Sequence, residues 1–337
     1  MEPSGREREL SGEILRSVSR SFFLSVRLLP RRLRQPVGLA YLLARATDTI
    51  ADTFEVPVGQ RREQLKKLAV AIQAGAPDPS LAADLKGSFV PLQPNDSERR
   101  LMLVLPDCLA WLRSIDPKDG ADIKTVLARI NQAQMMDLDR FENPQELRAL
   151  ANARELVEYA YLIAGCVGEF WTAVCARHLP DFAERSREDM DALGRQYGEG
   201  LQLVNILRDA HGDLRAGRCY FPADELAAAG LKPSEIFEHP LVFKPIFETW
   251  LARAESGLKA GIEYADAIRD RRVRAATALP ALIGARTITL LRSAGVKALA
   301  RKVKVPRGEV RGMLGSVAIT LASRRTMRNI FERNLRP

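Results

Sequence analysis

The sequence has few residues suited to soft-metal or redox chemistry. Its four cysteines contain no C-x-x-C pair, and its three histidines show no metal-ligand spacing. At least two of the cysteines fall in helical runs, where a free thiol packs as a small hydrophobe. We therefore expect reduced, structural cysteines and surface or loop histidines. His211 is also a candidate for a phosphate contact, because it lies inside an acidic motif described below.

Long apolar runs and strand patterns are missing as well. No apolar run approaches the roughly 20 residues that cross a bilayer. The N-terminal sequence MEPSGREREL lacks the apolar segment of a secretion signal. No stretch shows sustained two-residue alternation, and no G-x-G-x-x-G fingerprint marks a Rossmann dinucleotide site. We therefore predict an all-α protein with almost no strand, located in the cytoplasm.

The composition limits the possible domain organisation and the possible binding partners. With 46% hydrophobic and 28% charged residues among 337, the chain is large enough to bury a core and enclose a cavity. We expect residues 1–10 to be flexible and residues 11–337 to form a single domain. The formal net charge of +9 fits nucleic acid, an anionic membrane or small polyanions. We expect no nucleic-acid partner, because no recognised motif is present and few aromatic residues interleave with the basic ones.

Residues 38–52, GLAYLLARATDTIAD, predict a buried helix that turns one polar stripe toward a cavity. At 3.6 residues per turn, this stripe contains Tyr41, Arg45, Asp48 and Asp52, while apolar residues cover most of the remaining surface. Charged groups on such a helix are costly in a dry core, so they must meet each other, a metal or a polar ligand. The alternative is a carboxylate pair on a solvated helix face.

A second copy of this arrangement lies in residues 197–222, YGEGLQLVNILRDAHGDLRAGRCYFP. Carboxylates without histidine or cysteine nearby suit hard divalent ions, and Mg2+ prefers a few carboxylates, several waters and phosphate oxygens. The two motifs together predict a diphosphate held between two acidic helices. The residues of the second stripe step by three and four: Gly198, Gln202, Asn205, Asp209 and Asp213.

Five segments occur in an order that resembles the squalene and phytoene synthase family, the head-to-head prenyl synthases. They are VSRSFFLSVRLLP, YLLARATDTIAD, YAYLIAGCVG, LQLVNILRDAHGDLRAGRCYFP and VKVPRGEV. The resemblance runs from about residue 11 to about residue 315, and ATDTIAD is similar to the squalene synthase version of the first acidic motif. It implies a single-domain isoprenoid (class I terpenoid) synthase fold, with helices around a central cavity.

The SRSF stretch is a candidate for substrate binding. Ser19, Arg20 and Ser21 offer hydroxyl and guanidinium donors suited to diphosphate oxygens, the alternative being a helix cap beside a surface arginine. The resemblance implies that this stretch contacts phosphate and that Phe22 lines the first substrate pocket. Tyr159 matches a family tyrosine and is implied to handle a proton near the diphosphate.

Basic residues follow the second acidic motif. Arg208 and Arg218 are natural partners for diphosphate charge, unless they pair with the neighbouring aspartates. VKVPRGEV resembles a segment linked to the reductive half of squalene synthesis. Lys304 and Arg307 in it are therefore candidates for contacting NADPH phosphates, bound without a Rossmann domain.

The implied reaction joins two farnesyl diphosphates. Mg2+ ions bridging Asp48, Asp52, Asp209 and Asp213 would clamp one diphosphate, and its departure gives an allylic cation. Attack by the second molecule and loss of a proton give presqualene diphosphate, which squalene synthases reduce with NADPH to squalene for sterol or hopanoid synthesis. The implied catalytic groups are Tyr41, Arg45, Tyr159, Asp48 and Asp209, and substrate binding adds Gln202 and Asn205.

Other functions stay open from the sequence. Product choice depends on cavity length and late cation control, so presqualene diphosphate, dehydrosqualene and phytoene remain alternative products without the reductive step. From another class, a non-catalytic helical interaction protein would keep the fold without the chemistry, although both acidic motifs are complete. We expect a monomer.

Elsewhere the pattern predicts helices; Gln134 and Asp137 could face the cavity, but we favour plain core packing for both. The C-terminal SRRTMRNIFERNLRP, residues 323–337, predicts a helix with an apolar stripe beside many arginines. This stripe favours peripheral contact with anionic membranes, and the alternative is a helix packed on the body. The expected elements are a turn over 30–36, a loop over 74–96, and helices over 58–75, 97–115, 119–140, 153–178, 244–269 and 275–294.

Overall fold

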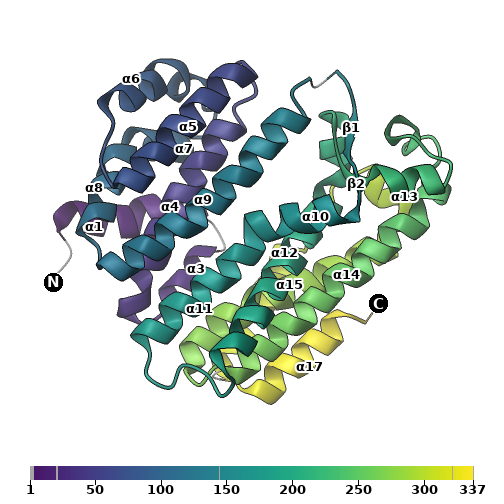
Figure 1. The fold of residues 1–337 in the computed structure, drawn as a ribbon. Coiled ribbons are helices and arrows are strands. Elements are labelled where there is room, and N and C mark those ends of the chain that lie inside the picture. Colours follow the sequence, from purple (N-terminus) through teal and green to yellow (C-terminus); the bar gives the residue numbers. More distant parts are fainter. Residues whose placement is uncertain (1–3, 20–21, 144, 321, 337) are drawn as a thin grey trace. The chain divides into compact units, whose positions relative to one another are not determined.

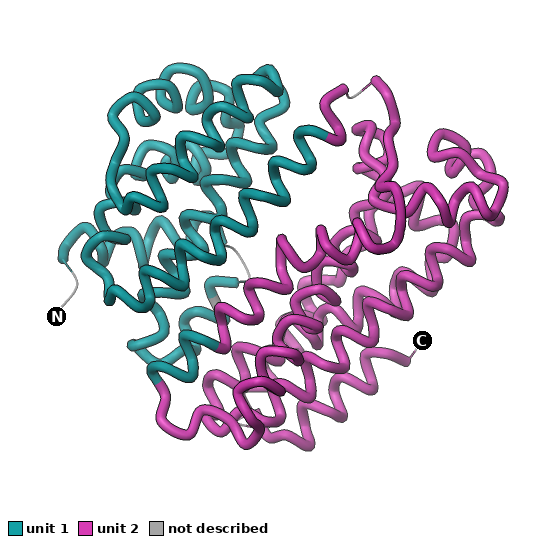
Figure 2. The backbone as a smooth tube through the Cα atoms, viewed as in Figure 1, with its two compact units in different colours: residues 1–139, 173–178 teal, residues 140–172, 179–337 magenta. Residues whose placement is uncertain are grey.

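The computed structural model describes residues 4–19, 22–143, 145–320 and 322–336, and most of them are helical (Figure 1). The chain is divided into two compact units: unit 1 contains residues 1–139 and 173–178, and unit 2 contains residues 140–172 and 179–337 (Figure 2). The predicted all-α class is confirmed. The prediction of almost no strand is also confirmed, since the described residues form just two short strands, β1 and β2.

Unit 1 is a set of helices around one long central helix, α4. Short helices near the N-terminus lead into α4, and α5, α7 and α8 pack against it. The elements are α1 Gly5–Glu9, the π-helical turn η1 Leu10–Ile14, α2 Leu15–Ser19, α3 Phe22–Leu28, α4 Arg31–Ala51, α5 Val58–Ala74, α6 Pro79–Ser88, the 3-10 turn η2 Val90–Leu92, α7 Asp96–Leu103, α8 Leu105–Ser114 and α9 Pro117–Arg140. Residues 5–9, within the segment expected to be flexible, form α1 in this structure.

The central helix confirms the predicted buried helix but begins earlier. Leu39, Leu42 and Leu43 have no exposed surface, which matches the apolar circumference expected of residues 38–52. The turn predicted over residues 30–36 is wrong, because α4 begins at Arg31 and continues through Pro36. Proline removes one backbone hydrogen bond there. Burial of the apolar face of this first half, with Leu33 fully buried, favours the continuous helix.

Two predictions between residues 74 and 115 are corrected. The predicted loop over 74–96 contains α6, because Asp78 accepts hydrogen bonds from the first backbone N–H groups and Pro79 occupies the first helical position. The helix predicted over 97–115 divides at Val104 into α7 and α8. Pro106 explains the division, since it has no N–H to donate to the preceding turn. The neighbouring predictions, α5 and α9, are confirmed within two residues.

Unit 2 is organised around α12, the helix that carries the second acidic motif. The helix predicted over 153–178 is confirmed at both ends and contains a π-helical turn, and those predicted over 244–269 and 275–294 are confirmed but begin earlier. The elements are β1 Arg148–Leu150, α10 Ala153–Ala160, the π-helical turn η3 Tyr161–Gly165, α11 Cys166–His178 (its last residues in unit 1), α12 Arg187–Arg215, β2 Arg218–Pro222, α13 Ala223–Ala228, η4 Pro233–Glu235, α14 Pro240–Ala267, α15 Arg271–Ala294, η5 Gly295–Leu299, α16 Arg307–Ile319 and α17 Arg324–Asn334.

Short strands tie the end of α12 to the segment before α10. β1 and β2 are parallel, with Arg148 opposite Arg218 and Ala149 opposite Cys219. The glycine between α12 and β2, Gly217, has a φ of 79°, a left-handed conformation that side chains rarely adopt. This turn carries Arg218 back beside the end of the helix that it follows.

Glycines let backbones in unit 2 approach closely. A Cβ placed on Gly198 of α12 would lie 2.0 Å from the carbonyl oxygen of Ala164, and one on Gly168 would lie 1.9 Å from that of Gly194. Contrary to the expectation that no such run is present, the run Ala153–His178 is long and apolar enough to span a membrane by length and composition alone, with half of its most apolar window buried. Because Gly168 of this run packs directly on the backbone of α12, we interpret the run as a core helix.

Substitution of Gly198 by alanine is expected to lower the free energy of unfolding by roughly 1–3 kcal/mol, because the new methyl group overlaps the backbone of Ala164. Chemical denaturation measures this loss. A methyl group on Gly212 of the same helix would meet no neighbouring element within 4 Å. There the same substitution should be neutral or stabilising by up to about 1 kcal/mol. Equal effects at the two positions would contradict the close packing.

The terminal helix α17 packs on the body of unit 2. Met327, Ile330 and Phe331 are buried, and the helix contacts α15 and α14. Two of its arginines are engaged, Arg324 with Glu184 and Arg328 with Asp266. The apolar stripe is therefore used inside the unit, which is the alternative named for this segment. The predicted membrane contact would rest on the remaining arginines alone.

Candidate active site

In unit 1 the first acidic motif lies along the last two turns of α4. Asp48 is a partly buried residue of the helix, and Asp52 follows as its C-cap, where its N–H donates to the carbonyl oxygen of Asp48 at 2.8 Å. Arg45 lies one turn earlier, with 4.0 Å between its Nη1 and Oδ2 of Asp48. The polar stripe predicted for this helix is therefore present, with its two carboxylates one turn apart.

Partners from other helices hold this stripe in place. Gln134 of α9 donates from Nε2 to Oδ1 of Asp48 at 2.7 Å and to Thr47 at 3.0 Å. Glu98 of α7 accepts from Nη2 of Arg45 at 2.5 Å. The interpretation of Gln134 as plain core packing is wrong, since it is 5% exposed but bonded to the motif. Glu98 falls within the helix predicted over 97–115 but gave no signal of a site role, because its partner Arg45 lies 53 residues away.

The pKa of Asp48 is raised to about 7. Loss of solvation within the surrounding protein is the main cause, and the negative charge of Asp52 adds to it, while Arg45 and the hydrogen bond from Gln134 act in the opposite direction. Protonation would compete with a cation for this carboxylate, because metals bind the ionised form.

Binding of Mg2+ at the first motif is therefore expected to depend on pH. At pH 6 roughly 90% of a carboxyl group with a pKa near 7 is protonated, so apparent affinity should fall about tenfold relative to pH 8. Mg2+-dependent diphosphate binding measured by calorimetry at the two pH values tests this expectation. Asp48→Asn should reduce the dependence to the part caused by protonation of the diphosphate itself, whereas a variant of the other unit, Asp209→Asn, should retain the full dependence. A wild-type protein with equal affinities at both pH values would contradict it.

Aromatic side chains flank the start of this motif. The ring of Phe22 stacks on that of Tyr41, with centroids 4.7 Å apart and planes inclined by 19°, and the hydroxyl group of Tyr41 donates to the carbonyl oxygen of Val18 at 3.4 Å. Ser19 is buried, and its hydroxyl group donates to the carbonyl oxygen of Leu15 within its own helix. In this structure the hydroxyl hydrogen of Ser19 is therefore used in a hydrogen bond to its own helix. Predictions for Arg20 and Ser21 lie outside the described residues.

In unit 2 the second acidic motif lines a cavity of about 470 Å³. One face of α12 supplies its polar wall, and the adjacent Leu203, Val204 and Leu207 are buried on the other faces. This is the arrangement that the three- and four-residue steps predicted. The structure brings most of the predicted residues of this half together in one lining: Tyr159, Gln202, Asn205, Arg208, Asp209, His211, Asp213 and Arg218, together with Tyr220 and Lys302.

Both aspartates of α12 carry cationic partners. Asp209 contacts Arg208 at 2.5 Å and Lys302 at 2.5 Å, and Asp213 accepts from Nη2 of Arg218 at 2.7 Å. These are the arginine pairs that the sequence left as the alternative to diphosphate contacts. Burial alone would raise the pKa of Asp209, but the hydrogen bonds from Arg208 and Lys302 outweigh it and lower the pKa. Asp209 is thus held ionised, in contrast to Asp48.

Tyr159 lies at the wall of this cavity and is 6% exposed. Its ring stacks on Tyr220 with centroids 5.0 Å apart, and the two hydroxyl groups are 3.4 Å apart. Tyr220 was missed as a site residue, although it belongs to the quoted CYFP segment. The two tyrosines therefore add aromatic surface to a cavity whose α12 residues are mostly charged or polar.

The segment after α15 contributes a lysine that the sequence reasoning also missed. Lys302 contacts Asp209, whereas Lys304 and Arg307 are exposed and are absent from the described cavity lining. His211 contacts the carbonyl oxygen of Leu299 through Nδ1 at 2.6 Å and Arg215 through Nε2 at 3.3 Å. It therefore fastens η5 to α12, and the predicted phosphate contact stays a prediction.

The donor sets suit Mg2+ with phosphate. Among the described residues, no group of three or more histidine, cysteine and acidic side chains forms a protein cage for a metal. Each motif instead offers two carboxylates, and Mg2+ is commonly held by one or two carboxylates, several waters and substrate phosphates. In unit 2 the three cations Arg208, Arg218 and Lys302 outnumber the two aspartates, so this cavity favours an anion together with the metal.

Comparisons with known proteins show which family the chain resembles. The family model described as "Squalene/phytoene synthase" matches residues 15–309. The chain is 28% identical over 236 residues to a bifunctional lycopene cyclase/phytoene synthase of Neurospora crassa, which covers 68% of this chain and 38% of that protein. It is 27% identical over 212 residues to a squalene synthase of Saccharomyces cerevisiae, with 63% and 45% covered. The chain therefore spans less than half the length of these relatives.

A solved structure of TcSQS with the ligand BPH1237 has the same fold. The two chains superpose with a TM-score of 0.78 at 19% identity, covering 98% of this chain and 90% of that one. The predicted isoprenoid synthase fold is thereby confirmed. At this identity the likeness concerns the fold.

Proposed function

Because the chain belongs to the squalene/phytoene synthase family, we propose that it joins two prenyl diphosphates head to head in a Mg2+-dependent reaction. The observation that carries this proposal is the cavity of unit 2, where two aspartates and three cationic side chains line one space. The first acidic motif on α4 supports it, since hard oxygen ligands recur there without histidine or cysteine.

Residues of the second motif supply the binding chemistry. Asp209 and Asp213 would hold Mg2+, which supplies charge neutralisation of the diphosphate leaving group when it is bound. Arg208 and Arg218 offer guanidinium donors to diphosphate oxygens from the same cavity, and Gln202 and Asn205 add neutral polar groups. Departure of the diphosphate leaves an allylic cation, and an apolar wall protects such a cation from water.

The first motif and two tyrosines would add further groups to the proposed reaction. Asp48 and Asp52 would hold Mg2+ in unit 1, with Arg45 fixed by Glu98 beside them. Tyr41, stacked on Phe22, presents an aromatic face that suits a prenyl chain or its cation. Tyr159 would handle the proton lost on ring closure; its hydroxyl group lies at the cavity wall, 3.4 Å from that of Tyr220.

We propose farnesyl diphosphate as the substrate and squalene as the product, formed through presqualene diphosphate. Support comes from the ATDTIAD form of the first motif and from the squalene synthase relative. NADPH would supply the reducing hydride when bound, and Lys304 and Arg307 are exposed cations that could hold its phosphates. A second candidate is phytoene synthesis without reduction, favoured by the name of the Neurospora crassa relative.

Product analysis tests both candidates. Purified protein is incubated with Mg2+ and either farnesyl or geranylgeranyl diphosphate, each with and without NADPH. Squalene that appears only with farnesyl diphosphate and NADPH supports the first candidate, and phytoene from geranylgeranyl diphosphate supports the second. If presqualene diphosphate or dehydrosqualene were the product in the presence of NADPH, the protein would not catalyse the reductive step. No condensation product from either substrate would overturn the proposal.

A further inference from the structure

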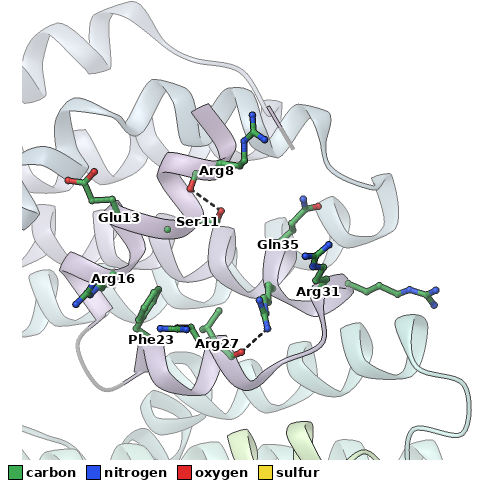
Figure 3. Close-up of a pocket in the computed structure, with 12 residues that line it drawn as sticks. Arg8, Ser11, Glu13, Arg16, Phe23, Arg27, Arg31 and Gln35 are labelled. Atoms are coloured by element: carbon green, nitrogen blue, oxygen red, sulfur yellow. Dashed lines mark hydrogen bonds between the residues drawn. The ribbon is translucent and has the colours of Figure 1, made fainter. Parts of the chain in front are cut away.

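Unit 1 contains a cavity of about 990 Å³ whose lining is dominated by arginine. It is formed by the N-terminal helices and the first turns of α4, and it contains neither Asp48 nor Asp52 (Figure 3). Figure 3 shows Arg16, Phe23 and Arg27 together on one side, and Arg8, Arg31 and Gln35 on another. The arginines of the lining are Arg8, Arg16, Arg27, Arg31, Arg32 and Arg34.

Most of these arginines have no acidic partner among the residues that the structure describes. Arg34 is held by backbone carbonyl oxygens, at 2.7 Å from Leu29 and 2.8 Å from Arg27. Glu13, the acidic residue of the lining, pairs with Arg100 at 2.7 Å. The other five arginines form no ion pair within the described part of the chain. Five uncompensated guanidinium groups around one space repel each other, and a bound anion would relieve that repulsion.

The start of α4 adds to this positive field. Arg31 and Arg32 occupy the first turn of a 21-residue helix whose first turn contains no acidic residue. The free N–H groups of a helix N-terminus carry partial positive charge, so acidic residues are favoured there and arginines are disfavoured. A phosphate group at this position would meet both the side chains and the helix end.

We propose that this cavity binds an anion with two or more linked phosphate groups, without a metal ion. The arginines come from α1, α2, α3 and α4 and surround a concave space, which suits a small molecule approached from several sides. A flat bilayer surface would meet only the outer rim of such a space. Guanidinium groups pair with phosphate oxygens through two parallel hydrogen bonds, which makes several arginines selective for a di- or polyphosphate over a monophosphate.

Calorimetry with inorganic pyrophosphate in EDTA tests this proposal on the full chain. The double variant Arg27→Gln/Arg31→Gln removes two exposed side chains of the lining, and a matched double variant, Arg113→Gln/Arg325→Gln, removes two exposed arginines outside it. We expect the first variant to weaken pyrophosphate binding at least tenfold and the second to change it less than twofold. Wild-type binding should fall with added salt and exceed binding of inorganic phosphate at least tenfold.

Three results would overturn the proposal: no pyrophosphate binding by the wild-type protein in EDTA, equal binding by the two double variants, or equal affinity for phosphate and pyrophosphate. Co-sedimentation with phosphatidylglycerol vesicles separates the membrane alternative. If the Arg27→Gln/Arg31→Gln variant lost vesicle binding while its pyrophosphate affinity stayed unchanged, the cavity would be a membrane contact instead. Thermal melting of both variants checks that folding is retained. The result is independent of the proposed condensation, which requires Mg2+.

Discussion

Asp209→Asn is expected to lower Mg2+-dependent turnover about a thousandfold or more while leaving the fold intact. The substitution keeps the shape of the side chain but removes the negative charge that a cation needs, and a metal ion supplies several kcal/mol of stabilisation to a departing diphosphate. Asp48→Asn should have an effect of the same order. Release of pyrophosphate from farnesyl diphosphate measures turnover, and thermal melting checks the fold.

The chain offers a matched control on the same helix. Asp191, near the start of α12, is a partly exposed carboxylate paired with Arg187 at 2.7 Å. Asp191→Asn therefore removes the same charge from the same helix, and an exposed i,i+4 pair contributes about 1 kcal/mol or less to stability. Its turnover should match that of the wild-type protein. If Asp209→Asn kept wild-type turnover as well, the second acidic motif would not hold the metal.

The two acidic stripes were predictable from the sequence because helical periodicity is local. The apolar positions that surround Asp48 on α4 and Asp209 on α12 are buried where a period of 3.6 places them. Errors arose where single residues were interpreted without their neighbours. Pro36 suggested a turn although its helix continues, and the Asp78–Pro79 pair is a helix start within a segment whose composition suggested a loop.

Most side-chain contacts to the two acidic stripes could not be predicted from the sequence, because they join segments that lie far apart in the chain. Gln134 lies 86 residues from Asp48, and Glu98 lies 53 residues from Arg45. Contacts across such separations produce no local sequence pattern. Periodicity could therefore place Gln134 on a helix, but it could not show which other helix its side chain contacts. Lys302 was missed for the same reason, since the basic segment suggested Lys304 and Arg307 by resemblance alone. Tertiary packing selects among such neighbours.

A buried charge in unit 1 leads to the largest expected loss of stability. Asp119, in the first turn of α9, is 2% exposed and contacts two residues at the end of α11. Its carboxylate accepts a hydrogen bond from Nη1 of Arg177 at 2.5 Å and lies 2.8 Å from Nε2 of His178. Arg177 also contacts Asp122 at 2.5 Å. The buried carboxylate is thus the centre of a network that joins α9 to the last turn of α11.

Asp119→Ala is expected to lower the free energy of unfolding by about 3–5 kcal/mol, the usual cost of removing one partner from a buried ion pair. The loss leaves His178 without its carboxylate and Arg177 with one acidic partner in place of two. Asp122→Ala is the control, because its carboxylate is 28% exposed and its removal leaves Arg177 bonded to Asp119. That variant should lose about 1 kcal/mol or less. Urea denaturation measures both, and equal losses would show that the network is not centred on Asp119.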